Sequence, residues 1–305
     1  MRMLSVQDVL AKKFARQAAI PQLEYHASGH CVHIGKISPG CLKCFVPDNF
    51  SINVPLGPEC NAKCVYCYGG LKDRSPSDGE IMAIKTRLLQ KARKHGQQDG
   101  IIPTISFTGG GEPLLSIDLI ERYMQYCKGI EKHLSRKPWY YVYTNGIIAD
   151  EQMICMLRDL GFNEIRFHLG ASNFARKVYR NLEVTVKHID TVTVETPAWP
   201  PHREPLFKML PILENTGVKH LNIGEIEIDS FNEKTIGAAL PDAEVYQLHA
   251  IHLYDGGLVY DLMEEVAAQG YSFSILDCSS FVKSMQRAPG KWLMHEPGPP
   301  ICTAE

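Results

Sequence analysis

Three cysteines lie close together in segment 53–70, which reads NVPLGPECNAKCVYCYGG. Cys60, Cys64 and Cys67 follow a C-x3-C-x2-C spacing. Three thiolates leave a four-ligand site incomplete, but they suit a [4Fe–4S] cluster in which one iron stays open to a small molecule. A zinc site is an alternative. It would need a fourth Cys or His ligand, for which Cys41 and Cys44 are nearby candidates.

A glycine-rich motif follows further along the chain. Segment 101–108 is strand-like and runs into GGGEPLL at 109–115. Glycines let a backbone approach a ligand closely, and the carboxylate of Glu112 could pair with an ammonium group. A simple strand-to-helix turn also explains a glycine run. Its place behind the cysteine loop favours a ligand site, although Gly109 has no assignable role.

The elements that must position these residues alternate between strand-like and helix-like segments. The predicted strands are 50–55, 101–108, 139–144, 164–169, 191–195, 220–226, 243–251 and 272–276. The predicted helices are 80–94, 116–134, 150–160, 173–187, 205–216 and 257–268. This alternation predicts parallel strands joined by crossover helices. The expected fold class is α/β, a full or partial TIM-like (β/α) barrel with its chemistry at the carboxyl ends of the strands.

Three regions are expected along the chain. Residues 1–49 read as an N-terminal helix and a cysteine-bearing loop. Residues 50–284 read as the barrel, and residues 285–305, rich in proline, read as a C-terminal tail.

The sequence CNAKCVYC, with Tyr66 directly before its last cysteine, resembles the radical SAM superfamily. The resemblance implies a barrel of the radical SAM type. It also implies that Cys60, Cys64 and Cys67 hold a [4Fe–4S] cluster whose open iron binds S-adenosylmethionine (SAM). Tyr66 would then lie against the adenine of SAM.

The glycine-rich motif resembles the Gly-Gly-Glu motif of the same superfamily. By this resemblance Gly110, Gly111 and Glu112 bind the amino group of SAM. The segments VETPAWP and LNIGEIEI also look like distant relatives of pyruvate formate-lyase activating enzyme. The resemblance covers residues 40–230 and is specific only at the cluster and Gly-Gly-Glu motifs.

Polar residues end the next predicted strands. Thr144 and Asn145, in the sequence YVYTNG, could meet the ribose hydroxyls of SAM or could cap a turn. The TNG sequence recurs at this position in related enzymes, which favours the ligand interpretation. His168 is either a structural histidine or a contact to ribose or substrate. Arg166 lies on the same face, and the same two interpretations apply to it.

Three glutamates follow in the later strands. Glu195 precedes a proline-rich turn, and a carboxylate inside a barrel needs a partner or a ligand, so contact with SAM or substrate is expected. Glu225 and Glu227 share one face of the extended segment HLNIGEIEID at 220–229. They could bind a polar substrate or form a solvated edge.

The remaining cysteines divide into two groups. Cys127 and Cys155 lie at apolar positions of predicted helices and are expected to be buried. The upstream residues Cys31, Cys41 and Cys44 could form a second metal site, holding a second cluster or zinc, with Cys278 or Cys302 as a further ligand. A reduced, packed pair or a catalytic thiol are the alternatives for Cys41 and Cys44.

Composition excludes several classes of protein. The chain has 305 residues, 45% hydrophobic and 22% charged, with 32 basic and 34 acidic residues and a net charge of −2. These values fit a globular protein and give no basic face for bulk nucleic acid. We expect no membrane span and no secretory signal, so a cytoplasmic location is expected, where ten cysteines are more typical of metal binding or packing than of disulfides.

The expected function is reductive cleavage of SAM and abstraction of a substrate hydrogen by the resulting radical. A peptide, such as a ribosomally made precursor, is the first expected substrate. A glycyl-radical activating enzyme and an enzyme acting on a small metabolite are alternatives. The expected partner is an electron donor such as flavodoxin or ferredoxin. A zinc-binding interaction module and an iron–sulfur regulator are the rivals from other classes. No residue can be assigned to catalysis on the substrate.

Overall fold

A nine-stranded sheet organises the chain. The computed structural model describes residues 1–26, 31–42, 50–67, 76–95 and 102–278. The sheet order is β2-β3-β13-β9-β8-β7-β6-β5-β4. Its strands are β2 (Glu24–His26), β3 (Cys31–Ile34), β4 (Ser51–Leu56), β5 (Thr104–Gly109), β6 (Trp139–Thr144), β7 (Glu164–Phe167), β8 (Thr191–Pro197), β9 (His220–Gly224) and β13 (Ser274–Asp277).

The strands from β4 to β9, and then β13, pair in parallel. Their carboxyl ends therefore meet at one edge of the sheet. In the described part of the chain the sheet ends at β4 on one side and at β2 on the other, and these strands do not pair. The predicted α/β fold is confirmed, and the barrel is a partial one that stays open between its edges.

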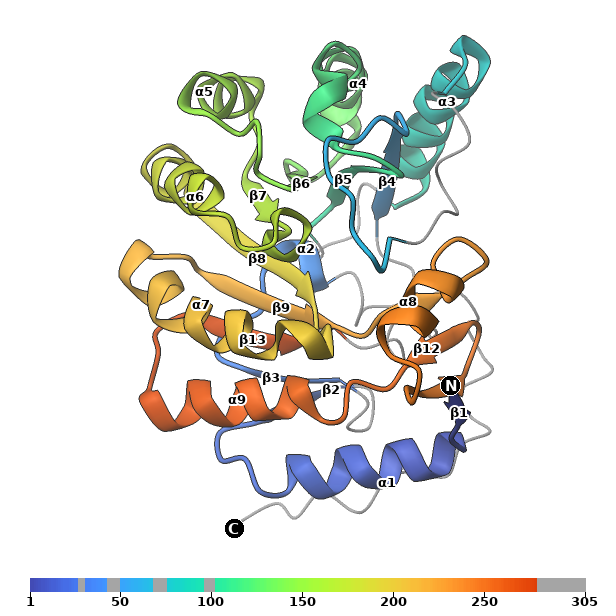
Figure 1. The fold of residues 1–305 in the computed structure, drawn as a ribbon. Coiled ribbons are helices and arrows are strands. Elements are labelled where there is room, and N and C mark those ends of the chain that lie inside the picture. Colours follow the sequence, from blue (N-terminus) through green and yellow to red (C-terminus); the bar gives the residue numbers. More distant parts are fainter. Residues whose placement is uncertain (27–30, 43–49, 68–75, 96–101, 279–305) are drawn as a thin grey trace.

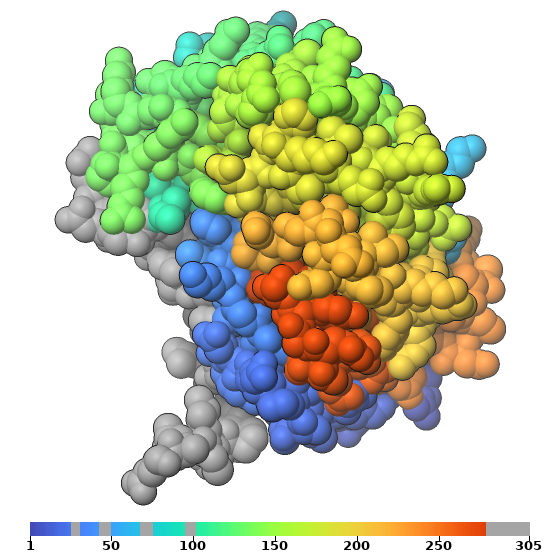
Figure 2. Space-filling view, turned by 90° about the vertical axis from the view of Figure 1, so that its left-hand side faces the viewer, coloured from blue at the N-terminus to red at the C-terminus, as the bar shows by residue number. Residues whose placement is uncertain are grey.

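Helices cover the outer side of the curved sheet (Figure 1). They are α3 (Asp78–His95), α4 (Ile117–Ile130), α5 (Glu151–Leu160), α6 (Arg176–His188), α7 (Arg203–Thr216) and α9 (Leu258–Gln269). The predicted start of α5 is confirmed, because the side chain of Asp150 accepts from the N–H of Met153. Gly161 and Gly217 end their helices in the left-handed conformation, as expected. Figure 2 shows this outer face, where segments follow one another in chain order from green to red.

The two faces of the sheet differ in polarity. Ile105, Val142, Ile165, Val194 and Leu221 point to the helices and are buried in the main apolar core. The alternate residues of the same strands face inward and are polar; they are Ser106, Tyr141, Tyr143, Glu164, Arg166, Thr193, Glu195 and Asn222. An inner face of this kind suits a polar ligand better than it suits a dry barrel core.

A second, four-stranded sheet lies beside the barrel, in the order β1-β11-β12-β10. Its elements, with the helix that follows β10, are β1 (Arg2–Met3), β10 (Glu227–Ile228), α8 (Glu233–Ala239), β11 (Glu244–Gln247) and β12 (Ile251–Leu253). The prediction of one strand over 243–251 was wrong. β11 and β12 form an antiparallel hairpin, because the chain turns where the N–H of Leu248 donates to the carbonyl of Ala250 at 2.9 Å.

The N-terminal region has more regular structure than the expected helix and loop. The helix is present as α1 (Val6–Gln17), but residues 24–26 and 31–34 form β2 and β3, and a short helix α2 (Pro39–Leu42) follows. Cys31 therefore lies in a strand and Cys41 in a helix rather than in a loop. Strands of three or four residues carry too little periodicity to be predicted. The division at 1–49, 50–284 and 285–305 stays a prediction, and residues 285–305 lie outside the described residues.

A buried cluster of charges ties α1 to the barrel. The ammonium of Lys13 lies 2.8 Å from a carboxylate oxygen of Glu225, and both side chains are buried. Asp255 and Asp277 act on the same lysine and are fully buried as well. Burial raises the pKa of Asp255 to about 6 and that of Asp277 to about 7, and the nearby carboxylate of Glu225 adds to both shifts.

Candidate active site

The cysteine loop begins directly after β4, at the carboxyl edge of the sheet. Cys60 is exposed, and Cys64 and Cys67 are half-buried. The N–H of Cys67 donates to the carbonyl of Cys64 at 3.2 Å, and the N–H of Ala62 donates to the sulfur of Cys60 at 3.4 Å. These hydrogen bonds close tight turns within the loop, and its thiols are partly exposed to solvent.

The glycine-rich loop lies on the backbone just before Cys60. The N–H of Glu112 donates to the carbonyl of Glu59 at 2.7 Å, and a Cβ at Gly111 would overlap that carbonyl. Gly109 pairs with Leu56 in the β4–β5 ladder, where a Cβ would lie 3.1 Å from the carbonyl oxygen of Gly57. Glycine at 111 therefore permits the close approach of two loops, and Gly109 gains the packing role that the sequence left open.

The Glu112 carboxylate is buried and joins the loop after β5 to the loop after β6. It accepts from the hydroxyl of Thr144 at 2.7 Å, from the N–H of Asn145 at 2.6 Å and from the N–H of Leu114 at 3.1 Å. Burial raises the pKa of this carboxyl, and the three hydrogen bonds oppose that rise. The side chain thus positions the loops. Contact between the Gly-Gly-Glu motif and SAM stays a prediction.

Asn145 closes the connection between the three loops. Its side-chain amide donates to the side-chain oxygen of Asn61 at 2.6 Å, within the cysteine loop. Its own oxygen accepts from the N–H of Ile147 at 3.0 Å. The loops after β4, β5 and β6 are therefore held as one unit around the predicted cofactor site.

Tyr66 is the buried centre of an aromatic group beside the thiols. Its ring centroid lies 5.9 Å from that of His168, 5.6 Å from that of Trp199 and 6.1 Å from that of His202. Burial raises the pKa of Tyr66, and Cys64 and Cys67 add to the rise. The hydroxyl is buried and has no hydrogen-bond partner among the described residues.

His168 contributes a second buried polar atom without a hydrogen-bond partner in the described part of the chain, its Nε2. Burial lowers the pKa of His168 to about 4, with Glu195 opposing and His202 assisting the shift. The imidazole is therefore neutral near pH 7. The two unpartnered atoms of Tyr66 and His168 mark a place where a polar ligand is expected.

Glu195 lies deeper on the inner face, beside Arg166 rather than in the ring group around Tyr66. It accepts from the guanidinium of Arg166 at 2.8 Å and from the amide of Asn222 at 2.9 Å. Arg166 also pairs with Glu164 at 2.8 Å and lies over the ring of Tyr141. The side chain of Glu195 is 22% exposed whereas that of Arg166 is 3% exposed, so Glu195 is the accessible member of the pair.

The donor set at the cysteine loop fits a [4Fe–4S] cluster. Among the described residues, no three His, Cys, Asp or Glu side chains converge on one metal-ion position. A cluster binds each cysteine through a different iron, so its ligands need no common point. The three thiols, with two unpartnered buried polar atoms nearby, are compatible with a cluster and its small-molecule ligand.

Of the upstream cysteines, Cys31 and Cys41 lie on the inner side of the barrel. Cys31 and Cys41 share a small apolar cluster with Leu276. The thiol of Cys31 donates to the carbonyl of Asp277 at 3.3 Å, and the amide of Asn222 donates to the sulfur of Cys41 at 3.2 Å. Cys44 and Cys302 lie outside the described residues, so the second metal site stays a prediction.

The two cysteines that we expected to be buried, Cys127 and Cys155, differ in their burial. Cys127 is fully buried in the main core, as expected, and burial raises its pKa to about 12. Cys155 is only half-buried, with its sulfur 3.8 Å from Nδ1 of His188. Cys155 therefore lies on a partly exposed side of α5 and is not part of the main apolar core.

Glu225 and Glu227 do not act as a pair. Glu225 is buried against Lys13, and the hydroxyl of Tyr246 donates to its carboxylate at 2.5 Å. Glu227 is partly exposed, 3.6 Å from the ring nitrogen of His249. Of the two alternatives for this pair, a solvated edge does not hold for Glu225, because it is buried against an ionic partner from α1, far away in sequence.

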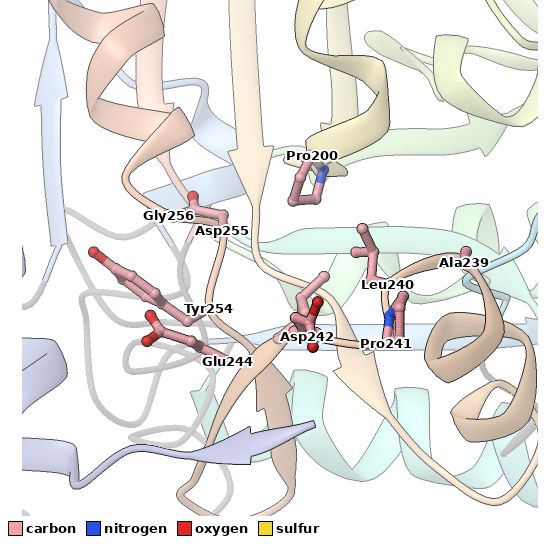
Figure 3. A pocket seen from close by; sticks show the side chains of 11 residues that line it. Pro200, Ala239, Leu240, Pro241, Asp242, Glu244, Tyr254, Asp255 and Gly256 are labelled. Atoms are coloured by element: carbon pink, nitrogen blue, oxygen red, sulfur yellow. The ribbon is translucent and has the colours of Figure 1, made fainter.

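A pocket of about 370 Å³, partly open to solvent, lies between the second sheet and the turn at Pro200 (Figure 3). It is lined by the segments Ala239–Glu244 and Leu253–Gly256. The cysteine loop and the Gly-Gly-Glu residues do not line it. It is therefore distinct from the candidate active site.

Sequence reasoning missed several residues around Tyr66. Trp199 and His202 come from the turn after β8, and Gly170 comes from the turn after β7, where a Cβ would lie 2.5 Å from the hydroxyl of Tyr66. These residues could have been identified by their position directly after predicted strands, where the carboxyl ends of the strands lie. The sequence after β8 is rich in proline and was interpreted only as a turn.

Comparisons with known proteins agree with this geometry. The radical SAM superfamily profile matches residues 54–188, which hold the cysteine loop, the glycine-rich loop and the strands β4 to β7. Residues 54–188 therefore match a radical SAM superfamily domain, which covers somewhat less than half of the chain. A domain of this kind indicates an enzyme and leaves its reaction open. The family implies a [4Fe–4S] cluster and SAM as cofactors.

Individual relatives are distant. The uncharacterized protein MJ0804 of Methanocaldococcus jannaschii is 24% identical over 153 residues, which cover 46% of this chain and 45% of that protein. The match thus spans less than half the length of this curated relative. SuiB of Streptococcus suis bound to S-adenosylmethionine has a TM-score of 0.51 at 10% identity, over 79% of this chain and 53% of SuiB. A structure of anSMEcpe with bound AdoMet has a TM-score of 0.46 at 20% identity, over 57% of this chain and 50% of that one. The likeness to SuiB is one of fold.

Proposed function

We propose that the protein is a radical SAM enzyme whose residues Cys60, Cys64 and Cys67 bind a [4Fe–4S] cluster. When bound and reduced by an external electron donor, such a cluster would supply the electron for reductive cleavage of SAM, and with it the chemistry of hydrogen-atom abstraction from the substrate. The observation that carries this proposal is the junction of the three loops. The backbone of Glu112 bonds to Glu59, and its carboxylate bonds to Thr144 and Asn145.

Each residue of this junction has a role that follows from its contacts. Gly111 lets the loop after β5 approach the backbone beside Cys60. Glu112 fixes the distance between the loops after β5 and β6. The ring of Tyr66 and the neutral imidazole of His168 form a wall that can take the adenosyl part of SAM, with two polar atoms available to it.

We further propose a peptide as the substrate. Among the described residues the edge strands β4 and β2 of the partial barrel do not pair with each other, and an unpaired strand edge can receive an extended chain. The inner face offers the carboxylate of Glu195 and the ring of Tyr143, both half-buried, to backbone and side-chain polar groups. Arg166 and Asn222 hold the Glu195 carboxylate in place, so this carboxylate can select a hydrogen-bond donor on the substrate.

The cluster is tested by anaerobic reconstitution. The wild-type protein should turn brown and bind about four irons per chain. Cys60→Ala should lose most of this iron, whereas Cys155→Ala should keep it, because Cys155 lies on α5 away from the loop. A colourless wild-type protein with stoichiometric zinc would overturn the proposal in favour of a zinc-binding module.

The peptide is tested by deuterium transfer. Reconstituted enzyme is incubated with SAM, a reductant and candidate peptides deuterated at their α and β carbons. A true substrate should deliver deuterium into 5′-deoxyadenosine, seen by mass spectrometry. If deuterated small metabolites deliver it and no peptide does, the peptide proposal fails.

A further inference from the structure

The second half of the cysteine loop is held by a part of the chain far away in sequence. The amide nitrogen of Asn232 donates to the carbonyl of Tyr66 at 3.2 Å, and the hydroxyl of Thr235 donates to the carbonyl of Val65 at 2.7 Å. Asn232 precedes α8 and Thr235 lies within it. In Figure 1 the loop after β4 descends toward α8.

Asn232 is buried, and both polar atoms of its side chain form hydrogen bonds. Its nitrogen also donates to the carbonyl of Glu227 at 2.9 Å, and its oxygen accepts from the N–H of Asp229 at 2.9 Å. The carboxylate of Asp229 accepts from the N–H of Phe231 at 2.9 Å. This turn is satisfied by its own local bonds, so the bond from Asn232 to Tyr66 is an additional one.

Apolar packing joins the same two segments. Tyr66 shares a buried cluster with Ile228 and Ile236, which flank Asn232, and Cys64 packs against this cluster. The loop is therefore held from one side by apolar contacts and at its carbonyls by two side chains. The contact is specific in direction, because hydrogen bonds fix how a peptide group points.

We propose that Asn232 and Thr235 form a clamp that positions the peptide groups between Val65 and Cys67. The proposal rests on the proposed function, because these groups adjoin two of its three ligands. Hydrogen bonds and peptide dipoles around thiolate ligands set cluster potential and retention. The second sheet, through this clamp, thereby takes part in holding the cofactor. Asn232 and Thr235 are positioning residues.

Two conservative substitutions remove the clamp with little change in shape. Thr235→Val removes the hydroxyl from an exposed residue. Thr86→Val is its matched control, because Thr86 is an exposed helical threonine bonded to the carbonyl of Met82 at 3.0 Å. Asn232→Asp keeps the acceptor oxygen and removes the donor nitrogen. Asn163→Asp is its control, because Asn163 uses its oxygen to accept from the N–H of Tyr140 at 2.9 Å.

The reconstituted proteins are compared by the rate of iron loss to a chelator and by the reduction potential of the cluster. The variant N232D/T235V should lose iron about tenfold faster than wild type, and its potential should be shifted. The two controls should match wild type. Equal rates and equal potentials in N232D/T235V and wild type, with unchanged thermal unfolding, would overturn the clamp. If Asn232→Asp does not fold, Thr235→Val alone decides the same comparison.

The iron-free protein gives a readout that does not depend on the cofactor. Alkylation of Cys64 and Cys67 by iodoacetamide should be several-fold faster in N232D/T235V, with Cys60 unchanged, because the loop near Tyr66 opens more often. Equal alkylation rates would overturn the clamp even if wild type binds iron. A wild type that binds no iron would overturn the proposed function, and the alkylation result would still decide the clamp.

Discussion

The carboxylate of Glu112 accepts a hydrogen bond of 2.6 Å from the backbone N–H of Asn145, in a site where Glu112 is buried. The same carboxylate accepts from the hydroxyl of Thr144. Glu112, whose contact with SAM stays a prediction, thus joins the loop after β5 to the loop after β6. Charge-assisted bonds of this kind are among the stronger ones in proteins. The relative position of the loops after β5 and β6 therefore depends on this one side chain.

Glu112→Gln should weaken SAM binding. Its amide nitrogen would face the N–H of Asn145 or the N–H of Leu114, so at least one bond is replaced by an unfavourable contact between two donors. We expect the dissociation constant of SAM to rise about tenfold or more, as measured by equilibrium dialysis with reconstituted protein. Glu183→Gln, at an exposed position of α6, is the control. An unchanged dissociation constant in Glu112→Gln would contradict the positioning role.

Gly170→Ala should destabilise the site through overlap with Tyr66. The new methyl group would lie 2.5 Å from the tyrosine hydroxyl and 2.8 Å from the hydroxyl of Thr196. We expect a loss of about 1–3 kcal/mol in the free energy of unfolding, measured with urea. Tyr66→Phe alone should change the free energy of unfolding very little, because the hydroxyl has no hydrogen-bond partner in the described part of the chain. The double variant should recover part of the loss, and strict additivity would count against direct contact.

Lys13→Met should be strongly destabilising. Removal of the ammonium leaves Glu225 buried without its ionic partner, beside Asp255 and Asp277. A loss of about 3–5 kcal/mol in the free energy of unfolding is expected. Lys12→Met is the matched control. Lys12 is exposed and pairs with Glu244 at 3.3 Å, so a loss below about 1 kcal/mol is expected there. Similar losses in both variants would show that the charge cluster contributes no special stability.

Stability should fall as the pH rises toward neutrality. The carboxyls of Asp255 and Asp277 have folded-state pKa values of about 6 and about 7, raised from 3.8 mainly by burial. A carboxyl with a raised pKa binds more protons when folded, so its contribution is complete below pH 3.8 and is lost as the pH rises through the folded value. Each group can change the free energy of unfolding by up to about 1.4 kcal/mol per pH unit.

The measurement is the free energy of unfolding of wild type and Asp277→Asn between pH 5 and pH 8. The wild type should lose stability relative to the variant over this interval, because the amide carries no charge at any of these pH values. A difference between the two proteins that does not change with pH would rule out a raised pKa at Asp277.

Much of the barrel is predictable from the sequence, because each strand and helix is long enough to carry a period. Strand 139–144 and helix 150–160 agree with β6 and α5 to within one residue. The cysteine loop and the glycine-rich loop are also predictable, since their residue types and their place after strands are local properties. The inner polar face was partly visible in the alternation of Arg166 and His168.

The second sheet was not predictable in the same way. β10 has two residues and α8 has seven, so neither carries a clear period. Asn232 reads as an ordinary turn residue in the sequence, and its bond to Tyr66 spans 166 positions. Glu225 likewise finds Lys13 only after folding. Contacts of this kind depend on tertiary structure, and no local sequence pattern predicts them.

The central claim is that the loop of Cys60, Cys64 and Cys67 supports reductive cleavage of SAM. Its most direct test is the formation of 5′-deoxyadenosine by anaerobically reconstituted protein with SAM and dithionite, followed by liquid chromatography. We expect the wild type to form this product and Cys60→Ala/Cys64→Ala/Cys67→Ala to form none. Product formation by the triple variant, or none from a wild type carrying its full iron content, would contradict it.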